Sequence, residues 1–137
     1  MKKKFLFVAF AFVAMFGLVS CGGKADTPEA AAEKYMDCIK GADWEGMLDL
    51  AYFDEKMSDE EVANAKKIAL PMFEVAGDKK LKEKDGIKDY EVKDVDLNKD
   101  EDKATVEVKV TYGDGSKDTE RVRVVKTDDE GWKVRLL

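Results

Sequence analysis

Residues 104–112 read ATVEVKVTY, and this strict alternation of apolar and polar side chains decides the fold class. Successive side chains of a strand point to opposite faces, so the stretch predicts a strand with one valine-rich face. The GDG segment at 113–115 predicts a turn, after which the alternation resumes at Val122 and Val124. With a three-residue loop, Val106 lies opposite Val122 in the predicted hairpin.

Two further strands complete the predicted sheet. A second turn leads to a last strand in which Trp132 and Val134 continue the apolar face, with Val134 opposite Val124. Residues 87–97 also alternate, but their apolar positions change phase near Asp94, which predicts a β-bulge there. The sequence therefore predicts an antiparallel four-stranded meander with one apolar face.

The chain before the sheet predicts three helices. Residues 27–29 (TPE) supply an N-cap, a proline at the first helical position and an acidic residue in the first turn of a helix that should end near Gly41. Asp43 can cap a second helix, which should end near Asp54. Residues 58–61 (SDEE) form a capping box that opens a third helix.

The third helix is expected to face the core with the apolar residues that follow at helical spacing. Pro71 should kink or end this helix, because proline lacks the N–H that a helix interior needs. Residues 78–85 should then form a solvated connection to the first strand. The residues expected to face the core are Val62, Ala65, Ile68, Ala69 and Met72.

Three helices followed by a curved meander predict an α+β fold, with the helices on one face of the sheet. The chain resembles the cone-shaped domain of the nuclear transport factor two and ketosteroid isomerase superfamily, and more narrowly its uncharacterised lipoprotein branch. The resemblance rests on residues 27–29, on GADW at 41–44 and on GWKV at 131–134, and it covers nearly all of residues 26–137. It implies helices folded over the concave face of the sheet, with a pocket in some members, and both enzymes and binding proteins share the fold.

The first 20 residues predict a signal peptide. Three lysines precede the apolar run 5–19, which is shorter than the roughly 20 residues of a spanning helix. A transmembrane anchor is the alternative interpretation. Residues 18–21 (LVSC) resemble the lipobox of bacterial lipoproteins, which implies cleavage before Cys21 and attachment of a diacylglyceryl group and a further acyl chain to it. An ordinary secretory signal with an incidental cysteine is the alternative.

This interpretation divides the chain into three parts: a signal peptide at 1–20, a lipidated cysteine with a tether at 21–26, and a single domain at 27–137. It predicts a bacterial envelope protein held to the membrane through Cys21, because two or more acyl chains anchor a protein stably. Gly22 is not the aspartate that resembles an inner-membrane retention signal, so the outer membrane is favoured.

The charge of the chain limits its partners. The chain carries a net charge of −6, and the predicted signal peptide contains three lysines and no acid, so the remainder carries −9. Such a surface repels nucleic acid. The sequence contains no histidine, which excludes histidine-based catalysis and histidine zinc sites. Cys38 is the one thiol left after lipidation of Cys21; it falls on an apolar helical stripe, so a buried thiol is expected rather than a reactive one.

Two patterns suggest chemistry that other features oppose. Residues 96–107 place Asp, Asn, Asp, Asp and Glu at calcium-loop positions, but Glu101 occupies the position that needs glycine, so a solvated loop is expected and no metal or cofactor is predicted. In the isomerase branch of the resembled superfamily, an acid and a tyrosine project into the cone. Asp94 with Tyr35 or Tyr52 could play those parts, as an alternative in which the domain is a small-molecule enzyme.

The polar face of the sheet gives the principal site hypothesis. If the predicted registers hold, five basic residues project from the face opposite the valines, with Glu107 and Glu120 as partial partners. Such a face could bind an anionic ligand, a glycan or an envelope protein; a solvated face with pairs such as Glu107 and Arg121 is the alternative. The sequence thus predicts a non-catalytic binding domain. The five residues are Lys109, Arg121, Arg123, Lys133 and Arg135.

Overall fold

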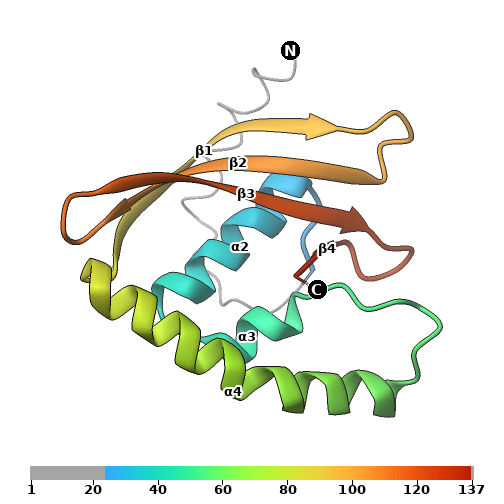
Figure 1. Ribbon diagram of the computed structural model, residues 1–137. Coiled ribbons are helices and arrows are strands. Elements are labelled where there is room, and N and C mark those ends of the chain that lie inside the picture. Colours follow the sequence, from blue (N-terminus) through green and yellow to red (C-terminus); the bar gives the residue numbers. More distant parts are fainter. Residues whose placement is uncertain (1–23, 137) are drawn as a thin grey trace.

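The computed structural model of the protein describes residues 24–136. Three helices precede a four-stranded antiparallel sheet (Figure 1), which confirms the predicted α+β class. The predicted signal peptide, the predicted lipobox and Cys21 lie outside the described residues. The elements are α2 (Pro28–Lys40), α3 (Trp44–Asp49), α4 (Asp59–Lys84), β1 (Ile87–Leu97), β2 (Lys103–Tyr112), β3 (Lys117–Lys126) and β4 (Trp132–Val134).

The sheet has the strand order β1-β2-β3-β4 and the registers predicted from the alternation. Val106 pairs with Val122, and Val124 pairs with Val134. The register of β1 against β2 shifts between Val92 and Asp94, which confirms the bulge. The turns and the alternation fix these pairings together, because a one-residue slip would turn every valine to the other face.

The first two helices begin at the predicted caps. The Thr27 side chain accepts a hydrogen bond of 3.1 Å from the Ala30 amide, and Asp43 accepts one of 3.0 Å from the Gly46 amide. However, α3 ends at Asp49 rather than near Asp54. The chain leaves the helix there because it pairs with β4: the Tyr52 amide donates to the Val134 carbonyl at 2.7 Å.

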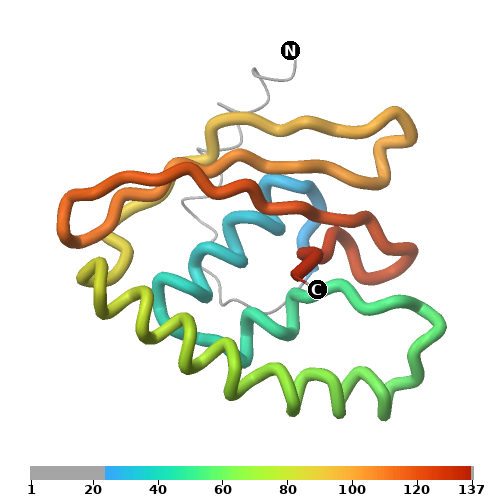
Figure 2. Tube along the Cα trace, viewed as in Figure 1, coloured from blue at the N-terminus to red at the C-terminus, as the bar shows by residue number. Residues whose placement is uncertain are grey.

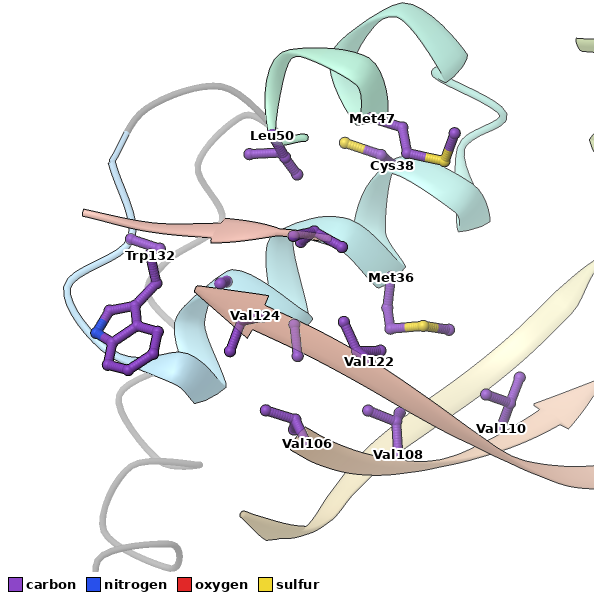
Figure 3. Close-up of a cluster of buried hydrophobic side chains, with 14 of the residues drawn as sticks. Met36, Cys38, Met47, Leu50, Val106, Val108, Val110, Val122, Val124 and Trp132 are labelled. Carbon is purple, nitrogen blue, oxygen red and sulfur yellow. The ribbon is translucent and has the colours of Figure 1, made fainter. Parts of the chain in front are cut away.

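The core lies between α2 and the apolar face of the sheet. Figure 3 shows valines from β2 and β3 directed toward sulfur-containing side chains of α2 and α3. Cys38 is fully buried, as predicted. Trp132 closes one end of this core and is 7 % exposed. Apolar burial on this scale is the main term that stabilises such a domain.

The course of α4 differs from the prediction. It continues through Pro71 to Lys84, so residues 78–84 are helical rather than a loop. Pro71 is exposed, so water can satisfy the carbonyl that the proline leaves without a partner. The predicted core stripe is also wrong at its centre, because Ile68 and Met72 are 70 % and 67 % exposed. The helix instead turns Leu70 and Phe73 toward the core.

The beginning of the described chain is fixed beside the last hairpin (Figure 2). Ala25 forms a bridge with Gly131, and the Trp132 amide donates to the Ala25 carbonyl at 2.9 Å. Gly131 has a φ of 72°, and a Cβ there would lie 2.4 Å from the Ala25 carbonyl oxygen. The chain therefore enters the domain at the β4 end of the sheet.

Candidate functional site

An inner cavity of about 220 Å3 lies between α2, α4 and the sheet. The helix α2 contributes Tyr35 and Ile39 to its wall, α4 contributes Phe73 and Gly77, and β2 contributes Tyr112. The wall is thus mainly aromatic and aliphatic. It occupies the place where the resembled superfamily folds helices over a concave sheet.

Trp44 forms one side of the cavity and depends on a glycine in α4. Its indole N–H donates to the Asp78 carboxylate at 2.9 Å. A Cβ on Gly77 would lie 2.4 Å from the Cη2 atom of Trp44, well inside the closest approach of real side chains. Only glycine at position 77 therefore lets the indole lie against α4 in this position.

The ionisable side chains of Tyr35, Lys80, Tyr112 and Glu120 border the cavity. The Lys80 ammonium lies 3.6 Å from the Glu120 carboxylate, and their side chains are 53 % and 37 % exposed, so this ion pair stands between the cavity and solvent. The Tyr35 hydroxyl has no hydrogen-bond partner among residues 24–136. Burial, together with the Glu120 charge, raises the pKa of Tyr35 to about 12. The phenol therefore stays protonated and can donate a hydrogen bond.

This arrangement suits a small molecule with an apolar body and an oxygen-bearing end. The aromatic wall can cover the body, and the Tyr35 hydroxyl and the Lys80 ammonium can donate to the oxygen. The cavity is smaller than the roughly 300 to 1,000 Å3 of sites for drug-sized ligands, so its ligand is correspondingly small.

The structure brings together only two of the five basic residues predicted to share the outward face of the sheet. Arg123 pairs with Thr105 on the face opposite the valines, and the Arg135 amide donates to the Arg123 carbonyl at 2.8 Å. Arg123 and Arg135 line one shallow groove of about 260 Å3, together with Asp96 and Thr105. Two guanidinium groups therefore share a groove, although a carboxylate lies in its wall.

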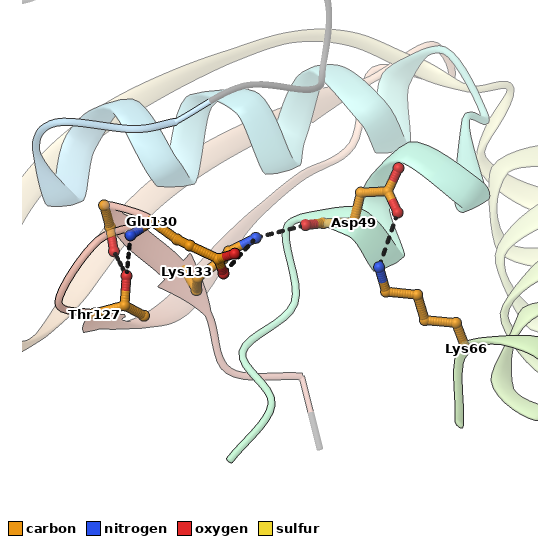
Figure 4. Close-up of polar contacts among 6 residues, drawn as sticks. Asp49, Lys66, Thr127, Glu130 and Lys133 are labelled. Atoms are coloured by element: carbon orange, nitrogen blue, oxygen red, sulfur yellow. Dashed lines mark hydrogen bonds and ion pairs between the residues drawn. The ribbon is translucent and has the colours of Figure 1, made fainter. Parts of the chain in front are cut away.

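The other three basic residues lie elsewhere on the sheet. Arg121 makes the predicted pair with Glu107, at 3.9 Å, and Lys109 lies opposite Glu91 in the register of β1 and β2. Lys133 turns away from the face. Its ammonium donates to the Asp49 carbonyl at 2.9 Å and lies 3.7 Å from Glu130 (Figure 4).

Lys133 also borders a larger groove of about 750 Å3, which lies between residues 49–66 and the β3–β4 loop. Most of the charged residues that line this groove are acidic, and one of them, Asp49, pairs with Lys66 at 3.1 Å (Figure 4). Within residues 24–136 no cluster of three or more potential ligands could hold a metal ion. In the calcium-like segment, Asn98 instead donates to Asp102 at 2.7 Å.

The structure does not bring Asp94, Tyr35 and Tyr52 together. Tyr35 lines the inner cavity, whereas Tyr52 lines the larger acidic groove. Asp94 pairs in register with Glu107 on the outward face, and its carboxylate accepts a hydrogen bond of 2.9 Å from the Val95 amide. The bulge therefore directs Asp94 away from the cone.

Two residues of the cavity were missed by sequence reasoning. Glu120 was assigned to the outward face, but it pairs with Val108 and borders the cavity, so that assignment is wrong. The signal was present, since Glu120 lies two residues before Val122 and shares its parity. The sequence prediction placed Lys80 in the solvated connection at 78–85, after a helix that Pro71 kinks or ends. The spacing of Phe73, Gly77 and Leu81 along one helical face could have revealed the longer helix.

A second group of perturbed side chains joins α2 to the edge strand β1. The Tyr90 hydroxyl donates to the Asp37 carboxylate at 2.5 Å, and burial together with this bond raises the pKa of Tyr90. Burial, followed by the charges of Asp37 and Glu29, raises the pKa of Glu33 to about 7. Glu33 is therefore partly protonated near neutral pH.

Membrane attachment is predicted through residues 1–21. The predicted signal peptide at 1–20 and the predicted lipidation site Cys21 lie outside the described residues. Among residues 24–136, no helix has the length and apolar character needed to cross a bilayer.

Comparisons with known proteins identify the family and the fold. A family described as "Domain of unknown function (DUF4878)" matches residues 19–135. A crystal structure from Campylobacter jejuni, of a protein named "Putative NTF2-like transpeptidase", is similar with a TM-score of 0.64 and 24 % identity, over 80 % of this chain and 98 % of that one. At this identity the likeness confirms the predicted NTF2-like fold and no more. A search of curated proteins found no match.

Proposed function

We propose that this chain, which belongs to the DUF4878 family, is a lipid-anchored protein of the bacterial envelope. Its domain binds a small, mainly apolar molecule without converting it. The inner cavity is the proposed site. The molecule's apolar part would lie against Trp44 and Phe73, and its polar end would face Tyr35 and Lys80.

The observation that carries this proposal is the Tyr35 hydroxyl. It is a protonated donor without a hydrogen-bond partner among residues 24–136, and it lines a cavity whose wall is mainly apolar. Solvent reaches this hydroxyl, since no fully buried side-chain nitrogen or oxygen among residues 24–136 lacks a partner. A bound molecule that accepts the Tyr35 hydrogen bond would take the place of solvent there and would be oriented by it.

Binding is preferred over catalysis for a chemical reason. The cavity is lined by no serine, threonine, cysteine or aspartate among the described residues, and the ionisable groups at its border are Tyr35, Lys80, Tyr112 and Glu120. Acyl transfer generally needs a nucleophile activated by an adjacent base. The name of the Campylobacter jejuni protein describes that protein, and a transpeptidase activity here would require a nucleophile from another part of this chain.

The proposed anchor limits the position of the domain. Cys21 precedes Ala25 by four residues, and Ala25 is fixed at the β4 end of the sheet. An extended chain spans at most about 3.5 Å per residue, so the domain would lie within about 15 Å of the bilayer. The variant Cys21→Ser should remain unprocessed or become soluble. If it partitions into the detergent phase as the wild type does, the lipid anchor is refuted.

The cavity is tested by mass spectrometry of the protein purified from native membranes under conditions that retain bound molecules. Tyr35→Phe removes only the hydroxyl and should lower the amount of co-purifying small molecule at least fivefold. Tyr52→Phe makes the same change in the acidic groove and should leave that amount unchanged. Equal recovery from both variants and the wild type would refute the cavity as the site.

A second candidate site is the groove lined by Arg123 and Arg135. Guanidinium groups pair well with carboxylate and phosphate because their fork permits two parallel hydrogen bonds. Two of them in one groove favour an anionic ligand, a glycan or the edge of an envelope protein. This second site is the binding face predicted from the sequence, reduced from five basic residues to Arg123 and Arg135.

A further inference from the structure

The outer face of α4 exposes three large hydrophobic side chains. Ile68, Met72 and Val75 are 70 %, 67 % and 71 % exposed, and their spacing of four and three residues places them on one face of the helix. We refer to these three residues as the outer stripe. Within the part of the chain that the structure describes, they are the large hydrophobic residues most open to solvent. A contiguous apolar surface of this kind commonly marks an interaction site.

The fold itself does not use the outer stripe. Helix α4 packs against the rest of the domain with its opposite face. On that face, Leu70, Phe73 and Gly77 contact the core and the cavity. Figure 1 shows α4 as the outermost layer, with α2 and α3 between it and the sheet. The stripe therefore has no partner among residues 24–136, and the folded domain leaves it available.

Charged residues flank the stripe in a symmetric arrangement. Glu61 lies seven residues before Ile68, and Lys82 lies seven residues after Val75, both on the face of the stripe. Lys79 and Glu83 also lie near the end of the stripe that Lys82 marks. The midpoint between Ile68 and Val75 and the midpoint between Glu61 and Lys82 coincide, between Pro71 and Met72. The first turn of α4 is acidic and its last turn is basic.

A face of this design complements itself. If a second helix of the same kind packs antiparallel about a two-fold axis between Pro71 and Met72, Ile68 of each copy meets Val75 of the other. The same operation brings Glu61 of each copy near Lys82 of the other. Antiparallel packing also sets the negative end of each helix dipole beside the positive end of its neighbour.

We propose that the outer stripe is the contact between two copies of this chain, which pair through antiparallel α4 helices. Charge complementarity favours a second copy as the occupant, because Lys82 of that copy pairs with Glu61, whereas a bilayer offers Glu61 no such partner. The pairing does not depend on the proposed cavity ligand. It is also compatible with anchoring, since a two-fold axis along the membrane normal places both predicted anchors at the same height.

Cross-linking of the full chain in native membranes tests the proposal. Met72 lies next to the proposed axis, so Met72→Cys places two thiols side by side, and a mild oxidant should link them into a dimer. Lys67→Cys is the matched control, since Lys67 is exposed on the same helix but away from the stripe. We expect at least fivefold more linked dimer from Met72→Cys, with wild type, whose Cys38 is buried, as the baseline.

Charge reversal then tests the register. Added to Met72→Cys, either Glu61→Lys or Lys82→Glu should lower dimer formation at least threefold, and the two together should restore it. Glu61 also belongs to the capping box of α4, so Glu61→Lys alone weakens the helix start. Recovery through Lys82→Glu cannot come from that cap and reports the contact between copies.

Three results would overturn the proposal. Equal dimer from Met72→Cys and Lys67→Cys would mean that the stripe is not the contact. Failure of the double reversal to restore the dimer would mean that the helices are not antiparallel in this register. Absence of the dimer, with the Met72→Cys thiol shielded from a water-soluble maleimide until detergent is added, would mean that the bilayer covers the stripe.

Discussion

The substitution Gly77→Ala tests whether the wall of the inner cavity depends on the contact between Trp44 and α4. In an exposed helix interior this change should be favourable, since alanine has the higher helix propensity. Here the new methyl group would lie 2.4 Å and 2.5 Å from two ring carbons of Trp44. The indole must move, and its hydrogen bond to Asp78 must stretch or break.

Opposing terms set the size of the effect. Alanine gains about 1 kcal/mol over glycine inside a helix. Overpacking a well-packed site costs about 1 to 3 kcal/mol, and loss of the indole hydrogen bond costs about 1 kcal/mol. The net result is a loss of about 1 to 3 kcal/mol, which corresponds to a melting temperature lower by about 4 to 12 °C for a domain of this size.

Thermal unfolding of the purified protein in detergent measures this loss, and Gly41→Ala is the control. A Cβ at Gly41 would meet only the Asp37 carbonyl, at an ordinary 3.5 Å, so that variant should melt close to the wild type. A double-mutant cycle isolates the contact: in a Trp44→Phe background, which leaves a smaller ring, Gly77→Ala should be neutral or stabilising. If Gly77→Ala raises the melting temperature of the wild type, the reasoning about this wall is wrong.

Three further predictions concern the core, the outward groove and the pH dependence of stability. Trp132→Ala should cost about 3 to 5 kcal/mol and nearly unfold the domain, and an unchanged melting temperature would contradict its burial. Arg123→Gln should leave stability equal or slightly higher, since it relieves the repulsion from Arg135, while pull-downs from the envelope fraction should recover less partner; unchanged recovery would remove the groove as a site. The pKa of Glu33 is raised from 4.5, its ordinary value in the unfolded chain, to about 7 in the folded protein. The folded state therefore binds the Glu33 proton more tightly, and the stability this gives is complete below pH 4.5 and is lost as pH rises through 7. Glu33→Gln should therefore stabilise the protein at pH 8 by about 1 kcal/mol, after allowing for solvent screening of a half-exposed group, with little change at pH 4; parallel urea-unfolding profiles of variant and wild type would contradict this.

The sheet could be predicted almost to the residue because two independent constraints agree there. Alternation fixes which side chains share a face, and the turn lengths fix which residues are opposite, so Val106 pairs with Val122 as expected. The assignment of Glu120 failed because its charge was given more weight than its parity. Near the beginning of β3 the inward face borders the mouth of the cavity, where the Glu120 carboxylate can pair with Lys80 in solvent.

The cavity could not be predicted because it depends on where helices lie over the sheet. Tyr35 was a candidate from the sequence, but the alternation of β1 gave no means of knowing that the bulge turns Asp94 outward. The basic face failed in part for a similar reason. Lys133 has the correct parity, yet β4 is only three residues long and pairs on its other side with the chain at Ala51, so the Lys133 side chain bends to the end of α3.

Helix α4 shows most clearly what apolar periodicity can and cannot decide. It carries two apolar stripes, one through Leu70 and Phe73 and one through Ile68 and Met72, and both recur at helical spacing. Periodicity identifies each stripe but does not say which one meets the core, and the sequence prediction chose the stripe that the structure exposes. The inner stripe was less visible because its closest contact is made at Gly77, which has no side chain to contribute to the pattern but admits the Trp44 ring. A helix with two apolar stripes has two surfaces to cover, and the domain covers only one, so the stripe that misled the prediction is the same surface that the folded domain leaves for a second copy.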